Sequence, residues 1–464
     1  MNVLLLAIDT LRADHLGCYG YKRPTSPVID RLAGQSALCT NFMTPGIPTH
    51  PSFTTLFCGQ HPIRHGVVAQ GGTRELAADT PTLPQLFLEG GYLTAAFDNM
   101  AGGSKAYFGR GFEIQIDSSR RRGCGLMVTC DEINSRLLPF LKQCGVSGEK
   151  FFAFVHYWDP HTPYWAPPRY RSLFFKGDPF NPAKTLEPLY RHQLGAEWKK
   201  TWLKRVLEDT GRDPDVTLTN PDYITALYDQ EVRYVDDGVG EVLETLDESG
   251  LSENTLVLLL SDHGECLTEH GIYFDHHGLY SENLNVPLAV RLPGRVSAGR
   301  RLGTLLQHSD LLPTLCEAAG LRLPEKTSPD GRSAWGLLTG QPSEERPADL
   351  FVTEECSWQK KWALRDSRYH FIRALEPDWY GNPMRELYDL SVDPRQTRNL
   401  AEQRPEVVRE LDGQLQGWID DRLKACGRAA DPLMETEISL LRQPGKAGDA
   451  AGGTGATGAV QAKV

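Results

Sequence analysis

The sequence NVLLLAI, residues 2–8, runs without a break into Asp9 and Thr10. An apolar run of this length is typical of a strand buried on both faces of a parallel sheet. Three later runs have the same form, and each is followed by an acid or a histidine: Tyr92–Phe97 before Asp98-Asn99, Phe151–Tyr157 before Asp159-Pro160-His161, and Thr255–Leu260 before Ser261-Asp262-His263-Gly264. These runs predict the central strands of one sheet.

Segments with helical periodicity separate these strands, at Ser26–Ser36, Thr82–Glu89, Asp131–Gln143 and Tyr223–Ser249. Strands that alternate with helices are wound into a parallel sheet through crossover connections. In such sheets ligands bind beyond the carboxyl ends of the strands. We therefore expect an α/β fold in which a large, mixed but mainly parallel sheet lies between helices, with the polar strand ends converging on one pocket.

The sequence changes in character near Asp349, where short runs typical of strands follow one another: Phe351–Cys356, Trp362–Arg365, Tyr369–Arg373 and Glu386–Asp389, then a helical segment, Pro405–Lys424. We expect a catalytic α/β domain over residues 1–348, an antiparallel C-terminal subdomain with its helix over residues 349–426, and an extension over residues 427–464. From about Gln443 the extension is rich in Gly and Ala and poor in large apolar residues, so it is expected to be disordered.

Composition excludes several classes of function. The net charge is −11 and there is no long basic stripe, so nucleic acid is not an expected partner. An acidic protein binds an anionic substrate only where a metal or local histidines reverse the field, which favours a metal site. The ten cysteines form no CxxC pair, which argues against a zinc ribbon or a disulfide framework. No apolar stretch approaches the roughly 20 residues of a membrane span and no signal peptide is recognised, so we expect a cytoplasmic protein without membrane contact.

Two strand ends carry residue types that hold metals. Asp9 follows the first strand directly, and Asp262 and His263 come just after the strand Thr255–Leu260. A carboxylate beside an imidazole suits Zn²⁺, Mn²⁺ or Fe²⁺ better than Mg²⁺. If both strands are central and parallel, the three side chains project into one crevice and leave positions open for a nucleophile and a substrate. The alternative is structural, with the aspartates as turn or helix caps and the histidine facing solvent.

The segment GIPTHPSFTTLFCG, residues 46–59, has the pattern of a loop that enters a short helix. Pro51 suits the first helical turn and Gly59 suits a C-terminal cap. Thr49 then lies at the helix N-terminus, where the dipole and unpaired N–H groups favour an alkoxide nucleophile. The alternative is that Thr49 is an ordinary helix cap.

Two loops dense in turn residues add three histidines. The loop Asp159–Tyr164 carries His161, and the loop Asp275–Gly278 carries His276 and His277. Either loop could supply a cation or a general acid for a leaving oxygen. The alternative is a loop histidine that hydrogen-bonds the backbone.

These segments, in this order, resemble the sulfatase-like branch of the alkaline phosphatase superfamily over residues 2 to about 418. The family's signature of Cys or Ser, any residue, Pro, Ser, Arg, four further residues and Thr-Gly is similar in spacing to Thr49–Gly59. The chemistry differs, because Thr49 takes the place of the Cys or Ser that sulfatases convert to formylglycine, and Phe53 takes the place of the Arg. Threonine at this position resembles the phosphoryl-transferring relatives, among them nucleotide pyrophosphatase/phosphodiesterases and lipoteichoic acid synthases.

The resemblance implies one divalent metal ion, with Mn²⁺ or Zn²⁺ favoured and Ca²⁺, Mg²⁺ and Fe²⁺ as alternatives. Its implied ligands are Asp9, Thr49, Asp262 and His263. Asp159 and His161 lie too close in sequence to match the spacing of the two-metal relatives, so a second metal is not expected.

The resemblance also implies roles in substrate binding and catalysis. Thr10 replaces a second acid of many sulfatases, and His276 or His277 stands where sulfatases have a Lys. The expected substrate-binding residues are Thr10, Asn99 and His161, and the expected catalytic residues are Thr49, His161, His276 and His277.

The implied reaction is ester hydrolysis, in which Thr49 attacks phosphorus, a histidine protonates the leaving oxygen and water releases the covalent intermediate. The expected substrate is a small anionic ester: a phosphate diester, a phosphonate monoester or a phosphomonoester. A sulfatase that works without formylglycine, a phosphoryl transferase and a non-catalytic anion-binding protein are the alternatives. The sequence indicates no oligomeric state.

Overall fold

The structure is a computed structural model that describes residues 1–438, apart from residue 72 and residues 101–104, 119–127, 191–194, 212–216, 342–349 and 378–380. The tail predicted to be disordered from about Gln443 lies outside the described residues. Within them, no helix combines the length and the apolar character that crossing a membrane requires.

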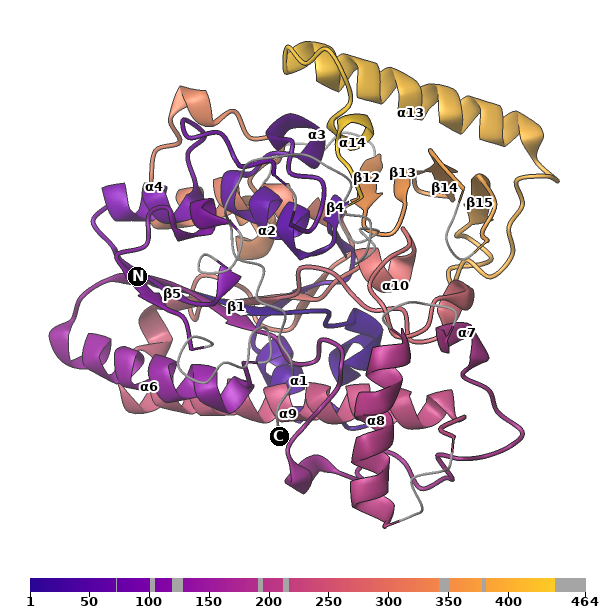
Figure 1. Cartoon of the computed structure of the whole chain (residues 1–464). Helices are drawn as coiled ribbons and strands as arrows, with labels where there is room; N and C mark the ends of the chain where they lie inside the picture. Colours follow the sequence, from indigo (N-terminus) through magenta and orange to yellow (C-terminus); the bar gives the residue numbers. More distant parts are fainter. Residues whose placement is uncertain are drawn as a thin grey trace, which may run out of the picture.

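An eight-stranded sheet forms the centre of the molecule (Figure 1). Its strand order is β10-β2-β9-β8-β1-β7-β5-β6. Its strands are β1 (Asn2–Ile8), β2 (Ala37–Cys39), β5 (Leu93–Phe97), β6 (Ile114–Ile116), β7 (Phe151–Tyr157), β8 (Thr255–Leu260), β9 (Leu288–Arg291) and β10 (Arg300–Leu302). The strands from β8 to β6 in this order are parallel, whereas β9 is antiparallel to β8 and β2. The predicted mixed, mainly parallel sheet is confirmed, with the four predicted strands next to one another.

β1 is apolar throughout because both of its faces are covered. Successive side chains of a strand point to opposite faces, so Val3 and Leu5 enter one core cluster while Leu4 and Leu6 enter another. All four are fully buried. Each such side chain contributes roughly 1.5–3 kcal/mol relative to exposure in water.

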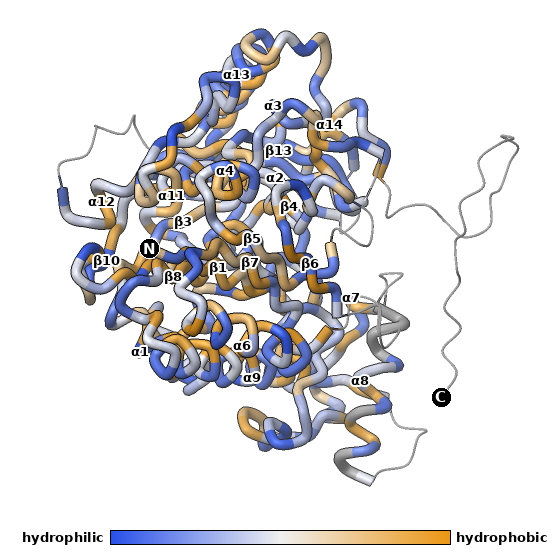
Figure 2. The backbone as a smooth tube through the Cα atoms, turned by 90° about the vertical axis from the view of Figure 1, so that its left-hand side faces the viewer, coloured by the Kyte–Doolittle hydropathy of each residue, from blue (hydrophilic) through white to orange (hydrophobic). Residues whose placement is uncertain are grey.

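Helices form a layer on each side of the sheet (Figure 1). One face is covered by α1 (Pro27–Gly34), α6 (Cys130–Ser147) and α9 (Pro221–Glu248), and the other by α2 (Thr49–Cys58), α4 (Leu83–Glu89) and α11 (Leu311–Ala319). Figure 2 shows apolar residues concentrated on the central strands and on the helix sides that face them. The four helices predicted between the strands are confirmed as α1, α4, α6 and α9. Local capping fixes two of the starts: Thr82 and Gln85 form a capping box, and Asn220 accepts from the Asp222 N–H.

Other elements lie outside these two layers of helices and the central sheet. Further α-helices are α3 (Pro62–His65), α7 (Glu187–Tyr190), α8 (Gly195–Thr210), α10 (Ser281–Leu284), α12 (Trp335–Thr339) and α14 (Pro432–Glu435). The strands β3 (Phe42–Met43) and β11 (Leu306–Gln307) form a separate parallel pair.

A second sheet with the order β15-β14-β13-β12-β4 forms the C-terminal part. β12 (Phe351–Cys356), β13 (Lys360–Arg365), β14 (Tyr369–Ala374) and β15 (Arg385–Asp389) are antiparallel, and α13 (Pro405–Ala425) packs on them (Figure 1). These strands and this helix match the sequence prediction. The fifth strand, β4 (Gly46–Ile47), pairs parallel to β12 and comes from the segment just before Thr49, which the sequence does not predict.

Glu354 of β12 is a buried carboxyl group beside β4. A Cβ on Gly46 would lie 2.8 Å from Glu354 Oε1, so glycine leaves the space that this side chain needs. Neither Glu354 oxygen has a hydrogen-bond partner among the described residues. Burial raises the pKa of Glu354 well above its ordinary value of 4.5, and Asp431 and Glu355 raise it further.

This raised pKa makes stability depend on pH. The folded protein keeps a proton that the unfolded chain loses above a pH of 4.5, so the stabilising contribution is complete below that pH and is lost as the pH rises through the folded pKa. We predict that Glu354→Gln raises the unfolding temperature at about pH 8 and changes it little at about pH 4. Thermal unfolding of both forms across this range provides the measurement, and a variant that melts lower than the parent at the higher pH would contradict the prediction.

Candidate functional site

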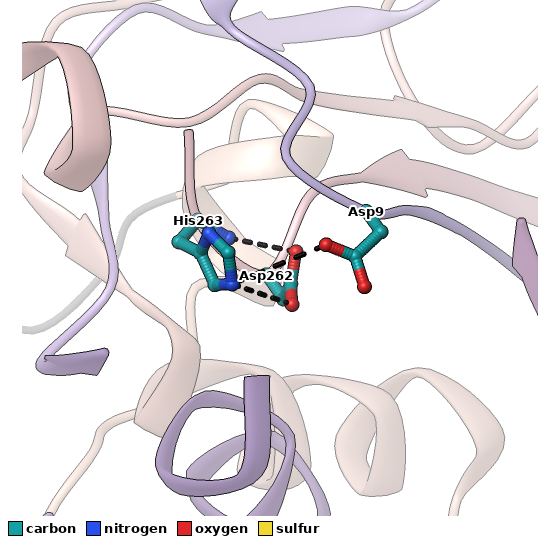
Figure 3. A group of neighbouring side chains, drawn as sticks. All are labelled: Asp9, Asp262 and His263. Atoms are coloured by element: carbon teal, nitrogen blue, oxygen red, sulfur yellow. Dashed lines mark hydrogen bonds and ion pairs between the residues drawn. The ribbon is translucent and has the colours of Figure 1, made fainter. Parts of the chain in front are cut away.

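The carboxyl ends of β1 and β8 bring three polar side chains together (Figure 3). The two strands are parallel neighbours with Ala7 paired to Leu260, so Asp9 meets Asp262 and His263 just beyond the strand ends. One ligand atom from each residue lies within 4.8 Å of the others, and all three residues are fully buried. His263 Nε2 is 3.2 Å from Asp262 Oδ2 and 4.0 Å from Asp9 Oδ1. The structure therefore joins the three residues that the strand ends predict as metal ligands.

The acceptor atoms of this cluster fit a cation. Among the described residues, Asp9 Oδ1 and Asp262 Oδ2 have no hydrogen-bond partner. Burial raises the pKa of Asp262, and the charge of Asp9 raises it further. Buried acceptors that face one another are costly without positive charge between them. Two carboxylates and one imidazole are a donor set suited to a divalent first-row metal.

The backbone orients both of the residues that follow β8. His263 Nδ1 lies 3.0 Å from the Gly264 carbonyl oxygen, so Nδ1 carries the proton and the Nε2 lone pair faces the carboxylates. A Cβ on Gly264 would lie 1.9 Å from the Glu282 carbonyl oxygen, so only glycine fits there. Asp262 Oδ1 accepts from the backbone N–H of His263 at 2.9 Å and of Thr10 at 3.3 Å.

Thr10 is held beside the cluster in an unfavourable conformation. Its φ of 53° lies in the left-handed region, which β-branched residues avoid. Tyr228 Oη donates to the Thr10 carbonyl oxygen at 2.9 Å and helps to hold it. Thr10 Oγ1 is buried and has no hydrogen-bond partner among the described residues. Backbone strain next to an unsatisfied hydroxyl is common at functional sites, so Thr10 remains a candidate for substrate binding.

Thr49 is the first residue of α2, and the helix ends at Gly59 with a left-handed φ of 69°. The predicted loop, helix and glycine cap are therefore present. Thr49 Oγ1 lies 3.3 Å from His263 Nε2, and the residue is 3% exposed. Ser52 Oγ, in the first turn of α2, donates to the Asp262 carbonyl oxygen at 2.8 Å and ties the helix to the end of β8. The positive end of α2 is thus fixed against the carboxylates.

The loop histidines occupy different positions. The ring centre of His276 lies 5.0 Å from that of His263 and 4.9 Å from that of His161. Burial lowers the pKa of His276; Asp275 opposes this effect and His161 and His263 add to it, leaving a pKa of about 3. His277 is directed instead to Asp275, with 3.1 Å between Nδ1 and Oδ1. His161 and His276 therefore form a row of rings with His263.

Asn99, also predicted to bind substrate, is connected to this row through a tryptophan. Its side-chain oxygen accepts from the Trp158 indole N–H at 2.8 Å, and the Trp158 ring lies 5.6 Å from the His161 ring. Asn99 is therefore linked to His161 through the Trp158 ring.

One histidine of the site, His156, is not predicted by the sequence patterns. His156 lies within β7, with Nε2 3.1 Å from Asp9 Oδ2 and Nδ1 3.0 Å from Asp98 Oδ1. Burial lowers the pKa of His156, but the two aspartates raise it more, to about 10. Burial raises the pKa of Asp9, but the hydrogen bond from His156 and the charges of His161 and His263 bring it down to about 2. The available signal was one polar residue in an otherwise apolar strand.

Phe53 fills the position at which the resemblance expects an arginine. It is fully buried, and its ring meets His156 edge to face with 5.0 Å between ring centres. The position therefore supplies an apolar wall to His156 and no charge to the site.

Comparisons with family models, with single proteins and with solved structures all find matches to this chain. The family model described as Sulfatase matches residues 1–321, and the model described as N-sulphoglucosamine sulphohydrolase, C-terminal, matches residues 268–421. Iduronate 2-sulfatase of Mus musculus is 26% identical over 463 residues, covering 85% of this chain and 78% of the relative. Choline-sulfatase of Rhizobium meliloti (strain 1021) is 29% identical over 252 residues, covering 54% of this chain and 45% of the relative. The crystal structure of a phosphonate monoester hydrolase of Agrobacterium radiobacter has a TM-score of 0.68 and 22% identity, covering 91% of this chain and 96% of that one.

The contact between His156 and Asp9 leads to a prediction about cation binding. Residues that hold a metal ligand in place typically change metal affinity by about ten- to a hundredfold when they are replaced. We expect His156→Gln to weaken Mn²⁺ or Zn²⁺ binding by a factor in that range, measured by chelator competition and by the metal content of the purified protein.

His65→Gln is the matched control, because His65 is also buried but contacts Thr55 at 3.1 Å and no carboxylate of the cluster. Equal metal binding by the His156 variant and the parent protein would contradict the prediction.

Proposed function

Because this chain belongs to the sulfatase family and is therefore a hydrolase of ester bonds, we propose that it cleaves a small anionic phosphorus ester with Thr49 as the nucleophile. The observation that carries the proposal is the place of the Thr49 hydroxyl. It is buried at the first residue of α2 and lies 3.3 Å from the nitrogen of His263 that faces Asp9 and Asp262.

Members of this family generally use a divalent metal ion. In this chain Asp9, Asp262 and His263 would hold it, with Thr49 as a further ligand, and Mn²⁺ or Zn²⁺ suits these donors. When bound, the ion lowers the pKa of a hydroxyl and offsets the negative charge of the ester.

Thr49 and His161 then have different roles in the reaction. Thr49 loses its hydroxyl proton to solvent, its Oγ1 forms the bond to phosphorus, and the bond from phosphorus to the leaving oxygen breaks. His161 Nδ1 donates to the Thr162 carbonyl oxygen at 2.6 Å and directs Nε2 away from the backbone, so the doubly protonated ring gives its Nε2 proton to the leaving oxygen. Water then attacks phosphorus and gives a proton back to His161 Nε2. The bond from phosphorus to Thr49 Oγ1 breaks, and Thr49 regains its proton from solvent.

His276 suits a different role in this reaction. Because its pKa of about 3 keeps the ring neutral, it can donate a hydrogen bond to an anionic ester oxygen without supplying a proton. Its side chain is 18% exposed, which leaves room for that contact.

The choice of phosphorus over sulfur rests on the nucleophile. A formylglycine hydrate carries two hydroxyl groups on one carbon and can expel the bound group through the second. A threonine ester has no second hydroxyl on that carbon, so water must attack the transferred group itself. Direct displacement of this kind is the ordinary route of phosphoryl transfer. Threonine as the nucleophile therefore favours phosphate diesters, phosphonate monoesters and phosphomonoesters.

A second candidate function is hydrolysis of a sulfate ester without formylglycine. The names of the relatives favour it, since both iduronate 2-sulfatase and choline-sulfatase are sulfatases. The phosphonate monoester hydrolase shares the fold, so the fold itself accommodates both kinds of ester.

Removal of the nucleophile tests the mechanism. We expect Thr49→Ala to lower kcat by at least about a thousandfold, as loss of a catalytic nucleophile does in other hydrolases, while Thr49→Ser keeps measurable activity. Thr55→Ala is the matched control, because Thr55 lies on the same helix and its hydroxyl also meets a histidine nitrogen, at 3.1 Å from His65 Nε2. Full activity of the Thr49→Ala protein would exclude Thr49 as the nucleophile.

A substrate panel tests the class of ester. The panel contains p-nitrophenyl phosphate, bis-p-nitrophenyl phosphate, a p-nitrophenyl phosphonate and p-nitrophenyl sulfate, assayed with Mn²⁺ or Zn²⁺ and again after chelation. We expect kcat/KM for at least one phosphorus ester to exceed that for the sulfate by about tenfold or more, a difference of about 1.4 kcal/mol in barrier, and chelation to abolish turnover. A sulfate ester turned over faster than every phosphorus ester would instead establish the second candidate.

A further inference from the structure

We infer that Trp358 and Glu355, in the C-terminal sheet, are positioning residues of the active site that hold the loop of His276 against the anionic ester. The inference rests on the proposed role of His276 as a contact to the ester oxygens. It extends the active site to a sheet that the strand-end pattern leaves outside it.

The end of β12 and the turn that follows it contact the histidine loop directly. The Trp358 indole N–H donates to Asp275 Oδ2 at 3.3 Å, and Glu355 Oε2 accepts from the backbone N–H of Gly278 at 3.1 Å. These two contacts grip the loop on either side of His276 and His277. Trp358 is 5% exposed and Glu355 is fully buried, so neither contact competes freely with water.

Glu355 is itself held by the turn. Ser357 Oγ donates to Glu355 Oε1, and Gln359 Nε2 donates to Glu355 Oε2 at 3.4 Å. The carboxylate is thus fixed before it meets the Gly278 N–H. Such fixed acceptors orient a partner with little loss of conformational entropy at the moment of binding.

Asp275 transmits the contact from Trp358 to His276. Its Oδ1 accepts from the backbone N–H of His276 at 2.8 Å and lies 3.1 Å from His277 Nδ1, while its Oδ2 faces Trp358. The two oxygens therefore bind on opposite sides, and the indole N–H fixes the rotation of the carboxylate. Loss of that donor removes one of the contacts that orient the carboxylate at the start of the histidine loop.

The rest of the loop is held by hydrogen bonds to its surroundings, and these link Asp275 to His276. Asp275 N–H donates to the Cys266 carbonyl oxygen at 3.2 Å, and Asn283 Nδ2 donates to the carbonyl oxygens of His277 at 2.7 Å and Gly278 at 2.9 Å. Gly278 has a φ of +88°, and a Cβ there would lie 2.7 Å from Ile272 Cδ1. Because these hydrogen bonds hold the loop at Asp275, His277 and Gly278, we expect a shift of Asp275 to displace the ring of His276.

β4 gives the same sheet a second link to the reaction. β4 pairs with β12 at Glu354 and Glu355, and the chain passes from Ile47 through Pro48 to Thr49. The strand that supplies Glu355 is therefore hydrogen-bonded to the strand that leads to the proposed nucleophile. The C-terminal sheet therefore contacts both the loop of His276 and the segment that leads to Thr49.

The experiment uses Trp358→Phe in the full-length, Mn²⁺-loaded protein, because this change removes the indole N–H and keeps an aromatic ring. Trp362→Phe is the matched control: Trp362 is fully buried in β13 and its indole N–H also donates to an aspartate, Asp431, at 2.9 Å. Both variants remove one buried donor from the same sheet. Only the Trp358 variant removes one that faces the histidine loop.

Two readouts are measured: kcat and KM for the best ester of the panel, and the Kd of inorganic phosphate by calorimetry, with inorganic sulfate as a second probe. We expect Trp358→Phe to weaken anion binding and kcat/KM by about tenfold, a typical effect of losing a hydrogen bond to a charged group, and Trp362→Phe to change them less than about twofold. A double variant, Trp358→Phe with His276→Ala, should be no worse than His276→Ala alone, because both changes remove the same contact.

Equal effects of Trp358→Phe and Trp362→Phe, or losses that add in the double variant, would overturn the inference and leave the turn a purely structural contact. This failure is distinguishable from failure of the proposed function, which is read from Thr49→Ala. The coupling between Trp358 and His276 is measured by anion binding as well as by turnover. The coupling can therefore be measured in either case, with phosphate as the tighter ligand or with sulfate as the tighter ligand.

Discussion

Two carboxylates, Asp9 and Asp262, are buried side by side at the ends of adjacent parallel strands, and their mutual repulsion constrains the rest of the site. At 4 Å, two like charges repel by about 4 kcal/mol where the effective dielectric constant is about 20. Two groups bring positive potential to the pair: the His156 ring lies 3.1 Å from Asp9, and the N-terminus of α2 begins at Thr49, whose hydroxyl lies 3.3 Å from His263 Nε2. Asp9 Oδ1 and Asp262 Oδ2, which have no hydrogen-bond partner in the part of the chain that the structure describes, support the proposal of a bound cation.

The two sheets hold different groups around this pair of carboxylates. The large sheet fixes the acids through the parallel register of β1 and β8. The second sheet fixes the groups that must meet the ester: β4 leads into Thr49, and the turn after β12 holds the loop of His276. Aliphatic and aromatic side chains form the core around the first sheet, whereas the contact between the two sheets includes buried polar hydrogen bonds. Polar contacts depend strongly on direction, which suits the orientation of a loop.

The parts of the site that the sequence predicts are those that follow a simple local rule. Asp9, Asp262 and His263 come at the ends of apolar runs, and Thr49 stands before a helix marked by Pro51 and Gly59, so pattern and position coincide. His156 lies inside a strand, where a single polar residue is equally compatible with a buried structural histidine. Its meaning depends on Asp98 and Asp9 meeting it from both neighbouring strands, which is a property of strand order.

Trp358 and Glu355 were even less accessible to sequence reasoning. They lie about 80 residues from Asp275 and Gly278 in the chain. Nothing local in the turn after β12 indicates which surface it faces, and only the docking of the second sheet brings it to the histidine loop. Periodicity in the sequence predicts where a helix or strand begins and ends and which of its faces is buried. Contacts between two separate sheets depend on tertiary packing, which periodicity does not predict.

Charge balance narrows the kind of ester that this arrangement suits. With a divalent ion bound, the positive charge of the ion and of His156 is matched by the carboxylates of Asp9, Asp262 and Asp98, and Phe53 contributes no charge. A site without excess positive charge does not favour a dianion over a monoanion, because each buried charge must be paired to offset its desolvation. Phosphate diesters and phosphonate monoesters carry a single negative charge at neutral pH. Within the proposed class of phosphorus esters, the uncharged Phe53 and the balanced charge of the site support these two kinds of ester over phosphomonoesters.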